Sequence, residues 1–488
     1  MYSHDEVYTS LRAAGYTGSE VIDSIWDGRV KSRDDLRHFL EPSEDKDVFD
    51  TLSVIARSMP QLSPLYFISA HYWMRLVGSS PSAMRWLAAL FSLLAIPGMY
   101  WLCLELFKSQ KTALVSAMLI SLSPYSILFA HDARQYSLWA SAILLSSAAF
   151  MIAIRKNRMV DWVIYLVTVI IGFYSHMLFV LVVAAHGLYM IAIKETRLDG
   201  RFVRFLVASV LALLALTPWV YQILSHWNIV TERLGWSNSE TSWSRYIQQW
   251  LIIFASPFID LNLGSRNIIP YLLRLPVIAL AGYALYFVVA STSRRVWSFL
   301  LLLMGVTVLP LFLSDLFRGG ILSIQGRYFM GAGVAIIPVV THLLVVKLSP
   351  TEKSIPLRWY LIAVLLFAAQ LGSASNILQA DNWWTKKHSW IDPQIGHILN
   401  QDSQPLVVVN GLWPTDLGDV LAISFMVDQD VRFLLNQSSA AIELPVGNSN
   451  VYWFHQTYWD FMESGSGQQY QATEVVPYFL WRMDIDEP

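Results

Sequence analysis

The stretch Phe299-Leu-Leu-Leu-Leu-Met304 lies inside an apolar run, residues 297–316, that is long enough to cross a bilayer as a helix. A helical span needs about 20 mostly apolar residues, because each residue advances the helix by about 1.5 Å. About ten such runs, including Ala89-Leu-Phe-Ser-Leu-Leu-Ala-Ile96, lie between Met84 and Leu378. In hydrocarbon the backbone must satisfy its own hydrogen bonds, so this pattern predicts a bundle of membrane-spanning helices.

The composition also indicates a membrane protein. The 488 residues are 55% hydrophobic and 14% charged, whereas soluble domains average about 25% charged residues. A net charge of −2 argues against a nucleic-acid-binding protein, which usually has a clustered basic face. The single cysteine, Cys103, lies in an apolar run and cannot form an intrachain disulfide. The first residues have no basic or apolar region, so no cleavable signal peptide is expected.

The loops between the predicted spans alternate in charge. Lys and Arg gather in every second loop, at 108–111, 155–158, 194–204, 294–295 and 347–358. Because basic loops stay in the cytoplasm, we expect the other loops, the N-terminal region and the tail after Gln379 to lie outside. The ten predicted spans are 84–107, 112–130, 136–154, 162–174, 177–193, 205–224, 271–291, 297–316, 329–347 and 359–377.

Two points of this topology stay open. Residues 162–193 are too long for one perpendicular helix and short for two. We expect a helical hairpin, because an even number of spans keeps both flanking basic loops inside; one long tilted helix is the alternative. The chain is also predicted to start outside, although no apolar segment precedes Asp5. Either the N-terminus is translocated unaided, or an upstream helix precedes this sequence.

Three regions follow from these patterns. Residues 1–80 form an outer-face region in which 64–76 are a helix lying in the membrane interface. Residues 81–378 form the transmembrane bundle. Residues 379–488 form a small outer-face α/β domain, with strands at 405–410, 431–435 and 450–454 and a helix at 417–428. The tail has no glycine-rich phosphate loop and no zinc-ligand spacing, so we expect it to serve stability or partner binding rather than catalysis.

Four polar groups are predicted on the outer face, where charged residues next to the membrane are costly and often functional. The acids Asp5, Glu6 and Asp132 could remove a proton from an acceptor hydroxyl. The guanidinium groups of Arg134 and Arg327 could bind a phosphate through paired hydrogen bonds. The four groups are His4-Asp5-Glu6-Val-Tyr8, His131-Asp132-Ala-Arg134-Gln-Tyr136, Phe173-Tyr-Ser-His176 and Ser323-Ile-Gln-Gly-Arg327-Tyr328.

Each group also has an ordinary structural explanation. The Asp-Glu pair could be solvated surface, and Arg134 could extend toward water beside a local ion pair. His176 could be a structural histidine, and Arg327 could anchor a helix end to lipid headgroups. Taken together on one face, however, the acids and arginines suit attack on a sugar that is linked to a lipid phosphate. The arginines would stabilise the phosphate leaving group while a carboxylate takes the proton of the acceptor.

Two other functions compete with this one. A transporter or flippase of lipid-linked glycans would favour paired charges in mid-membrane and repeated halves, and the sequence shows neither. A non-catalytic scaffold would use the tail to bind a partner.

At these residues the chain resembles membrane glycosyltransferases of the GT-C superfold, and most of all glycosyltransferase family 39, with its protein O-mannosyltransferases and aminoarabinose transferases. The resemblance covers about residues 1 to 350. This sequence departs from the family at three places: the first transmembrane helix, Ser63 in place of a proline, and Asp132 where glutamate is frequent. The matching motifs are His4-Asp5-Glu6-Val-Tyr8-Thr, Ser63-Pro-Leu-Tyr66-Phe, His71-Tyr-Trp-Met-Arg75-Leu, Ser82-Ala-Met-Arg85-Trp, Ser123-Pro-Tyr through Ala133-Arg134-Gln-Tyr136, Tyr174-Ser-His176 and Gly326-Arg327-Tyr328.

The resemblance implies a GT-C-like α-helical polytopic membrane protein with about ten spans and a small C-terminal α/β domain. It implies an inverting hexosyl or pentosyl transferase of the plasma or inner membrane. The substrates would be a polyprenyl-phosphate sugar and a lipid, glycan or protein acceptor, and no nucleic acid is involved. No cofactor or metal is expected, although a divalent cation is compatible with this interpretation.

The resemblance also assigns roles to residues. Asp5 would be the catalytic base with Glu6 beside it, and Asp132 would be a further acidic site residue. Arg134 and Arg327 would bind the donor phosphate. The remaining predicted pocket residues are Tyr66, His131, Tyr136, His176 and Tyr328.

Overall fold

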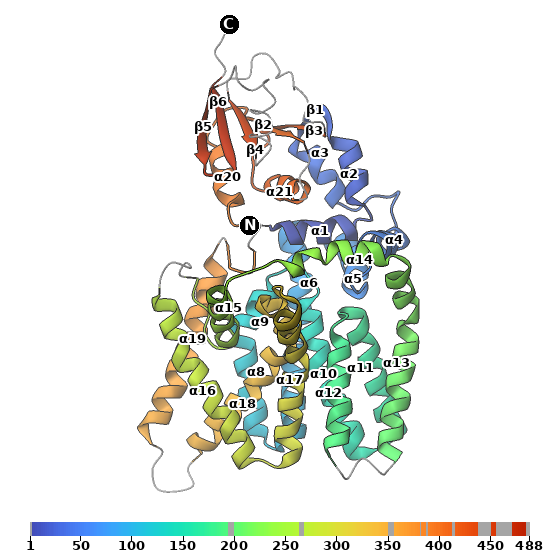
Figure 1. The fold of residues 1–488 in the computed structure, drawn as a ribbon, viewed down its shortest axis with the longest axis vertical. Helices are drawn as coiled ribbons and strands as arrows, with labels where there is room; N and C mark the ends of the chain where they lie inside the picture. Colours follow the sequence, from blue (N-terminus) through green and yellow to red (C-terminus); the bar gives the residue numbers. More distant parts are fainter. Residues whose placement is uncertain are drawn as a thin grey trace. The chain divides into compact units, whose positions relative to one another are not determined.

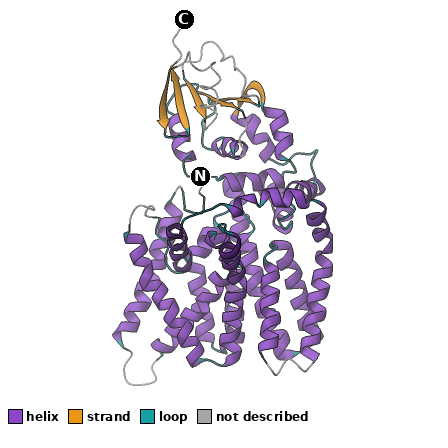
Figure 2. Ribbon diagram, viewed as in Figure 1, coloured by secondary structure: helices purple, strands orange, loops and turns teal. Residues whose placement is uncertain are grey.

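The computed structural model describes residues 2–193, 200–262, 268–349, 356–380, 382–386, 389–411, 415–437, 450–454 and 471–484. It divides into two compact units, whose ribbons are shown in Figures 1 and 2. Unit 1 comprises Met1–Val54, Phe67–Met84 and Asp381–Pro488, and unit 2 comprises Ile55–Tyr66 and Arg85–Ala380. The chain passes between the units inside three helices, α4 (Val48–Ser58), α5 (Leu65–Val77) and α6 (Pro81–Leu93).

Unit 2 is a bundle of apolar helices, as the long hydrophobic runs predict. Its helices lie side by side (Figure 1). Several of them carry exposed large apolar side chains, which suits a lipid environment. After α6 they are α7 (Ala95–Phe107), α8 (Gln110–Leu122), α9 (Pro124–Ala130), α10 (Tyr136–Lys156), α11 (Met159–Ser175), α12 (Phe179–Ala192), α13 (Gly200–Ser225), α14 (Trp227–Arg233), α15 (Trp243–Ala255), α16 (Ile269–Ser291), α17 (Arg294–Arg318), α18 (Met330–Leu348) and α19 (Leu357–Gln379), with short 3₁₀ turns η3 (Gly235–Asn238), η4 (Leu322–Ile324) and η5 (Gly326–Phe329).

The predicted fold class is confirmed: the chain is an α-helical polytopic membrane protein with a small sheet near its C-terminus. Within the described residues, seven helices are long and apolar enough to cross a membrane, and an eighth span is possible if the bent pair α8–α9 counts as one. The apolar helices α11 and α12 are shorter, and with them each of the ten predicted spans falls on helix.

The helical hairpin expected at 162–193 is present as α11 and α12, which meet around His176. Gly172 makes this close approach possible, because a Cβ atom there would lie 2.3–2.5 Å from three ring atoms of Phe179. Any larger residue would force the two helices apart or displace the ring.

The predicted span at 112–130 is not one continuous helix: it consists of α8 and α9, which are bent by 54° at a break at Ser123. Pro124 has no backbone N–H and disfavours a helical conformation at the residue before it. Ser123 accordingly has an extended backbone, with φ −60° and ψ 121°. Pro124 then starts α9 at a position that tolerates proline.

Unit 1 contains a six-stranded mixed sheet in the order β1-β3-β2-β4-β6-β5 (orange in Figure 2). The central strand β2 is parallel to β3 and β4, and the outer pairs are antiparallel. Strand β2 reads Leu-Val-Val-Val-Asn and is buried along its whole length, as expected for a central parallel strand. The strands are β1 (Asp27–Ser32), β2 (Leu406–Asn410), β3 (Arg432–Asn436), β4 (Val451–Phe454), β5 (Gln471–Val476) and β6 (Leu480–Asp484).

The predicted strands at 405–410, 431–435 and 450–454 are confirmed as β2, β3 and β4, and the helix at 417–428 is present as the shorter α21 (Asp416–Ile423). Strand β1 was not predicted, because Asp-Gly-Arg-Val-Lys-Ser is polar and mostly exposed. It joins the sheet through antiparallel pairing with β3, so the N-terminal and C-terminal segments of the chain share one unit. The other helices of unit 1 are α1 (His4–Ala13), α2 (Gly18–Ile25), α3 (Arg33–Arg37) and α20 (Asp392–Leu399), with the 3₁₀ turn η1 (His38–Leu40).

Candidate active site

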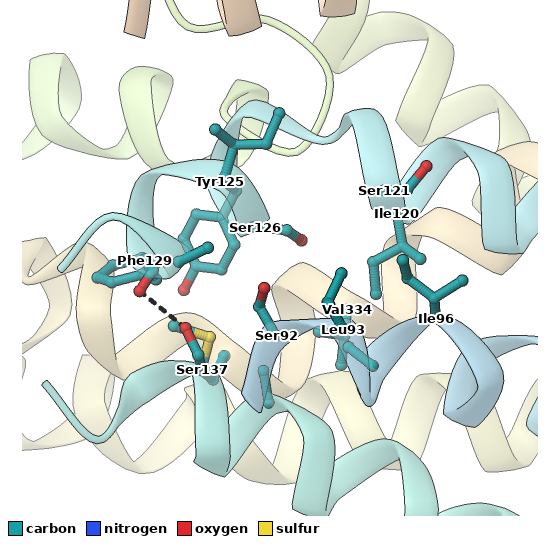
Figure 3. A pocket seen from close by; sticks show the side chains of 15 residues that line it. Ser92, Leu93, Ile96, Ile120, Ser121, Tyr125, Ser126, Phe129, Ser137 and Val334 are labelled. Carbon is teal, nitrogen blue, oxygen red and sulfur yellow. Dashed lines mark hydrogen bonds between the residues drawn. The ribbon is translucent and has the colours of Figure 1, made fainter. Parts of the chain in front are cut away.

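Arg134 lies in a short turn between α9 and α10 that is stabilised by hydrogen bonds. Ser137 Oγ, in the first turn of α10, donates a hydrogen bond of 2.7 Å to the carbonyl of Phe129 near the end of α9 (Figure 3). The backbone N–H of Arg134 lies 2.6 Å from the carbonyl of Asp132. The Arg134 side chain is 7% exposed, and its guanidinium lies 5.9 Å from the centre of the Tyr136 ring. This turn therefore presents a buried cation in a fixed place.

His176 lies beside this turn, at the tip of the α11–α12 hairpin. Its ring stacks on Trp139 of α10 at 3.9 Å between centres, with 9° between the planes. The ring centres of Tyr136 and Tyr328 are each 6.2 Å from that of His176. The backbone N–H of Leu178 donates to Nδ1 of His176 at 3.2 Å, which leaves Nε2 to carry the proton of a neutral ring.

Arg327 reaches the same cluster from η5, in the loop that precedes α18. Its guanidinium lies 5.4 Å from the centre of the Tyr328 ring and 5.2 Å from that of Trp236. Tyr125 of α9, which is 1% exposed, donates a hydrogen bond of 2.7 Å from its hydroxyl to the carbonyl of Gly326. The residue next to Arg327 is thus tied to the helix that leads into the Arg134 turn.

The rest of the Arg327 loop is held by hydrogen bonds to side chains of two helices, α17 and α15. Both carboxylate oxygens of Asp315 accept backbone N–H groups of the loop, from Leu322 at 2.9 Å and Ser323 at 2.6 Å. The indole of Trp250 donates to the carbonyl of Ser323 at 3.1 Å, and the hydroxyl of Tyr246 donates to the carbonyl of Gly320. These bonds fix the backbone from which Arg327 extends.

The electrostatics of this cluster favour an anionic ligand. Burial, followed by the positive charges of Arg327 and Arg134, lowers the pKa of His176 to about 3. The ring is therefore neutral at physiological pH and can donate a hydrogen bond from Nε2. Two guanidinium groups near a neutral imidazole can bind a phosphate oxygen from several directions and stabilise charge that develops on it.

Two cavities lie against the same helices. One, of about 90 Å³, lies at the bend of α8 and α9 and is lined by Ile120, Tyr125, Phe129 and Ser137 among others (Figure 3). The second has a volume of about 220 Å³ and is strongly apolar; Tyr125, Phe254, Gly282, Phe329 and Ile336 are among its lining residues. Since Phe329 follows Arg327 and Tyr328 in the chain, the larger cavity adjoins the loop that carries the cation.

The predicted acids Asp5 and Glu6 lie in the first turn of α1, in unit 1. Glu6 is completely buried: its Oε2 accepts from the N–H and hydroxyl of Ser3 at 3.0 and 2.9 Å and pairs with Nζ of Lys386 at 2.7 Å. Asp5 is only partly buried. Of these two acids, Asp5 is therefore the more accessible to solvent.

The other predicted residues differ in their exposure. His131 is exposed and Asp132 is half-buried, and both lie in the turn between α9 and α10. Tyr66 is fully buried in unit 2, where its ring lies 6.1 Å from that of Phe91. In unit 2, therefore, the structure brings together Arg134, Tyr136, His176, Arg327 and Tyr328. In the part of the chain that is described, no group of three or more His, Cys, Asp or Glu residues is placed to hold a metal ion.

Sequence reasoning missed the residues that contact His176 and Arg327 or hold the loop that carries Arg327. Trp139, Trp236, Tyr125 and Asp315 lie on four separate elements, and three of them lie in or next to apolar runs where they look like ordinary packing residues. The one available signal was the acid Asp315 inside a predicted span, because a carboxylate at that depth needs a partner.

Comparisons with known proteins agree with the family resemblance seen in the sequence. The family model described as dolichyl-phosphate-mannose-protein mannosyltransferase matches residues 61–222, a range that contains Arg134 and His176. The crystal structure of ArnT from Cupriavidus metallidurans bound to undecaprenyl phosphate aligns with a TM-score of 0.52 and 14% identity, over 88% of each chain. The apo state of that protein gives a TM-score of 0.51 and 14% identity, over 87% of this chain and 88% of that chain. No curated protein matches this sequence. The family match and the shared fold confirm the resemblance of this chain to the membrane glycosyltransferases of the GT-C superfold.

Proposed function

We propose that this protein transfers a sugar from a polyprenyl-phosphate donor to an acceptor hydroxyl at the outer face of the membrane. The observation that carries the proposal is the convergence of Arg134, Arg327 and a neutral His176 within unit 2. The ArnT structure with bound undecaprenyl phosphate supports the class of donor. The donor would be a sugar joined to an isoprenoid phosphate, and the acceptor a lipid, glycan or protein.

The reaction is a single displacement at the anomeric carbon of the sugar. The acceptor oxygen forms a bond to that carbon while the bond between the carbon and the phosphate oxygen breaks. Asp5 accepts the proton of the acceptor hydroxyl as general base. The leaving group is a polyprenyl phosphate monoester, which gains negative charge as it departs. Arg134 and Arg327 stabilise this charge, and Nε2 of His176 donates a hydrogen bond to a phosphate oxygen. The displacement inverts the configuration of the sugar.

The apolar cavity of about 220 Å³ beside the Arg327 loop suits part of the isoprenoid chain. It is lined almost wholly by apolar groups, so burial of isoprene units there would contribute to donor binding. An acceptor or sugar, with many hydroxyl groups, would leave polar groups unsatisfied in the same place. This contrast supports assigning the phosphate end of the donor to the arginines and the lipid end to the cavity.

The test uses the full chain in sealed proteoliposomes supplied with a membrane extract from cells that lack the protein, which provides the donor lipid and the lipid, glycan and protein acceptors. Mass spectrometry would follow the loss of polyprenyl-phosphate sugars and the release of polyprenyl phosphate. The proposal predicts release by the wild type and little release by Asp5→Asn, with matched protein levels. Movement of intact donor across the bilayer without release would instead indicate a flippase, and equal release by both proteins would overturn the role of Asp5.

A further inference from the structure

The first turn of α1 is held by residues from the C-terminal segment of unit 1. Glu6 is 0% exposed, and Lys386 provides the positive charge beside its carboxylate, at 2.7 Å. The same carboxylate closes the capping box with Ser3 at the start of the helix. A buried carboxylate without its cation is strongly unfavourable, so the geometry of this turn depends on Lys386.

His4 makes a second connection to the C-terminal segment. Its backbone N–H donates to Oγ of Ser389 at 2.8 Å, and its Nδ1 lies 3.0 Å from Oδ1 of Asp419 in α21. Burial opposes charge on the ring, but the hydrogen bond and charge of Asp419 outweigh it and raise the pKa of His4 above its usual value. The ring lies directly on α21 at Gly418, where a Cβ atom would be only 2.3 Å from Nδ1.

The far end of α1 is fixed as well. The carbonyl of Ala13 accepts hydrogen bonds from Oγ1 of Thr51 at 3.0 Å and from Nδ1 of His71 at 2.9 Å. Both donors are buried. The helix is therefore held at both ends, and Asp5 lies between the two residues, His4 and Glu6, that the C-terminal segment holds.

We propose that Lys386 and Asp419 are positioning residues, through which the C-terminal segment holds α1 and sets the place of Asp5. The proposal rests on the proposed role of Asp5 as general base. Lys386 acts through Glu6 and Asp419 acts through His4, and neither contacts substrate. A small misplacement of a catalytic group costs far more in the chemical step than in substrate binding, so loss of the clamp should lower kcat and leave the donor KM nearly unchanged.

The experiment compares Lys386→Met, Lys386→Arg and Arg482→Met in the full chain in nanodiscs. Arg482→Met is the matched control, because Arg482 also lies in the C-terminal segment and forms an ion pair, with Asp402 at 3.7 Å, but it belongs to β6. Hydrogen exchange of the α1 amides reports the clamp, and release of polyprenyl phosphate from the extracted donor reports kcat and KM. Asp419→Asn tests the second connection in the same two assays.

Lys386→Met should increase amide exchange in the first turn of α1 on the order of 100-fold, the size expected when a buried ion pair loses one partner. It should also lower kcat at least about 10-fold with little change in KM. Lys386→Arg should restore most of both values, and Arg482→Met should match the wild type. Asp419→Asn should change both in the same direction as Lys386→Met.

Unchanged α1 exchange in Lys386→Met would overturn the clamp. Faster exchange with an unchanged kcat would overturn the positioning role, because the contact would then serve stability alone. If the wild type released no polyprenyl phosphate, the proposed function would fail, whereas the exchange measurement would still decide whether the C-terminal segment holds α1.

Discussion

Replacing Tyr125 with phenylalanine tests whether the place of Arg327 depends on one buried hydrogen bond. The Tyr125 hydroxyl donates to the carbonyl of Gly326 at 2.7 Å, and Phe keeps the ring that packs closely against Gly333. The change removes the donor and leaves a buried carbonyl without it. Such a loss costs about 1–3 kcal/mol. If this energy is expressed in donor binding, affinity falls roughly 5- to 150-fold, since each 1.4 kcal/mol is about tenfold.

The assay is the binding of undecaprenyl phosphate to the purified chain in nanodiscs, followed by native mass spectrometry. Tyr165→Phe is the matched control, because Tyr165 is equally buried and its hydroxyl bonds to a side chain of α12, Nδ1 of His186, at 3.1 Å. The control should lose a similar amount of thermal stability but keep its affinity. Wild-type affinity in Tyr125→Phe, or an equal loss in both variants, would refute the idea that this bond positions Arg327.

Two further predictions follow from the cavity and from the buried acids. Gly282 lines the apolar cavity, and a Cβ atom there meets nothing within 4 Å. Gly282→Leu should therefore fold normally, and by occupying isoprenoid space it should weaken undecaprenyl phosphate binding by roughly tenfold, whereas the short geranyl phosphate should bind as before. Gly305→Leu on α17, where a Cβ atom also meets nothing within 4 Å, is the control and should leave the binding of both ligands unchanged. Burial and then the charge of Asp419 raise the pKa of Asp392 to about 7. Between about pH 4 and pH 7 this carboxyl is ionised in the unfolded chain but still protonated in the folded one, so the stability of unit 1 falls as the pH rises through this range. Asp392→Asn should therefore raise the melting temperature at both pH values but more at pH 8 than at pH 5, because only the first part of the loss has occurred by pH 5, and the two gains should differ by the equivalent of at least about 1.4 kcal/mol; a gain that is the same at both pH values would contradict this assignment.

The bundle was predictable because span length is set by the bilayer. Each apolar run of sufficient length became helix, and the short hairpin at 162–193 followed from loop charge alone. The sheet was predictable only where strands are buried on both faces, as in β2. Strand β1 is a polar edge strand whose place depends on pairing with β3, about 400 residues later, so no local pattern could reveal it.

The charged residues of the candidate site could be predicted from the sequence, but the side chains that contact them and hold them in place could not. Arg134 and Arg327 stand out because cations are rare next to apolar runs. The stacking of His176 on Trp139 and the bond from Tyr125 to Gly326 are contacts between helices that are distant in sequence. Likewise, the pairing of Glu6 with Lys386 joins residues 380 positions apart. That Asp5, Asp132, Arg134 and Arg327 serve one pocket stays a prediction.

The central claim assigns separate roles to the two kinds of residue: Asp5 accepts the proton of the acceptor hydroxyl, and Arg134 and Arg327 bind the donor phosphate. The most direct measurement compares Asp5→Asn with Arg327→Met for both undecaprenyl phosphate binding and sugar transfer. The account predicts that Asp5→Asn binds like the wild type yet transfers at least about 100-fold more slowly, the lower end of what a general base contributes, whereas Arg327→Met loses binding and transfer together. Rapid transfer by Asp5→Asn, or undiminished binding by Arg327→Met, would contradict it.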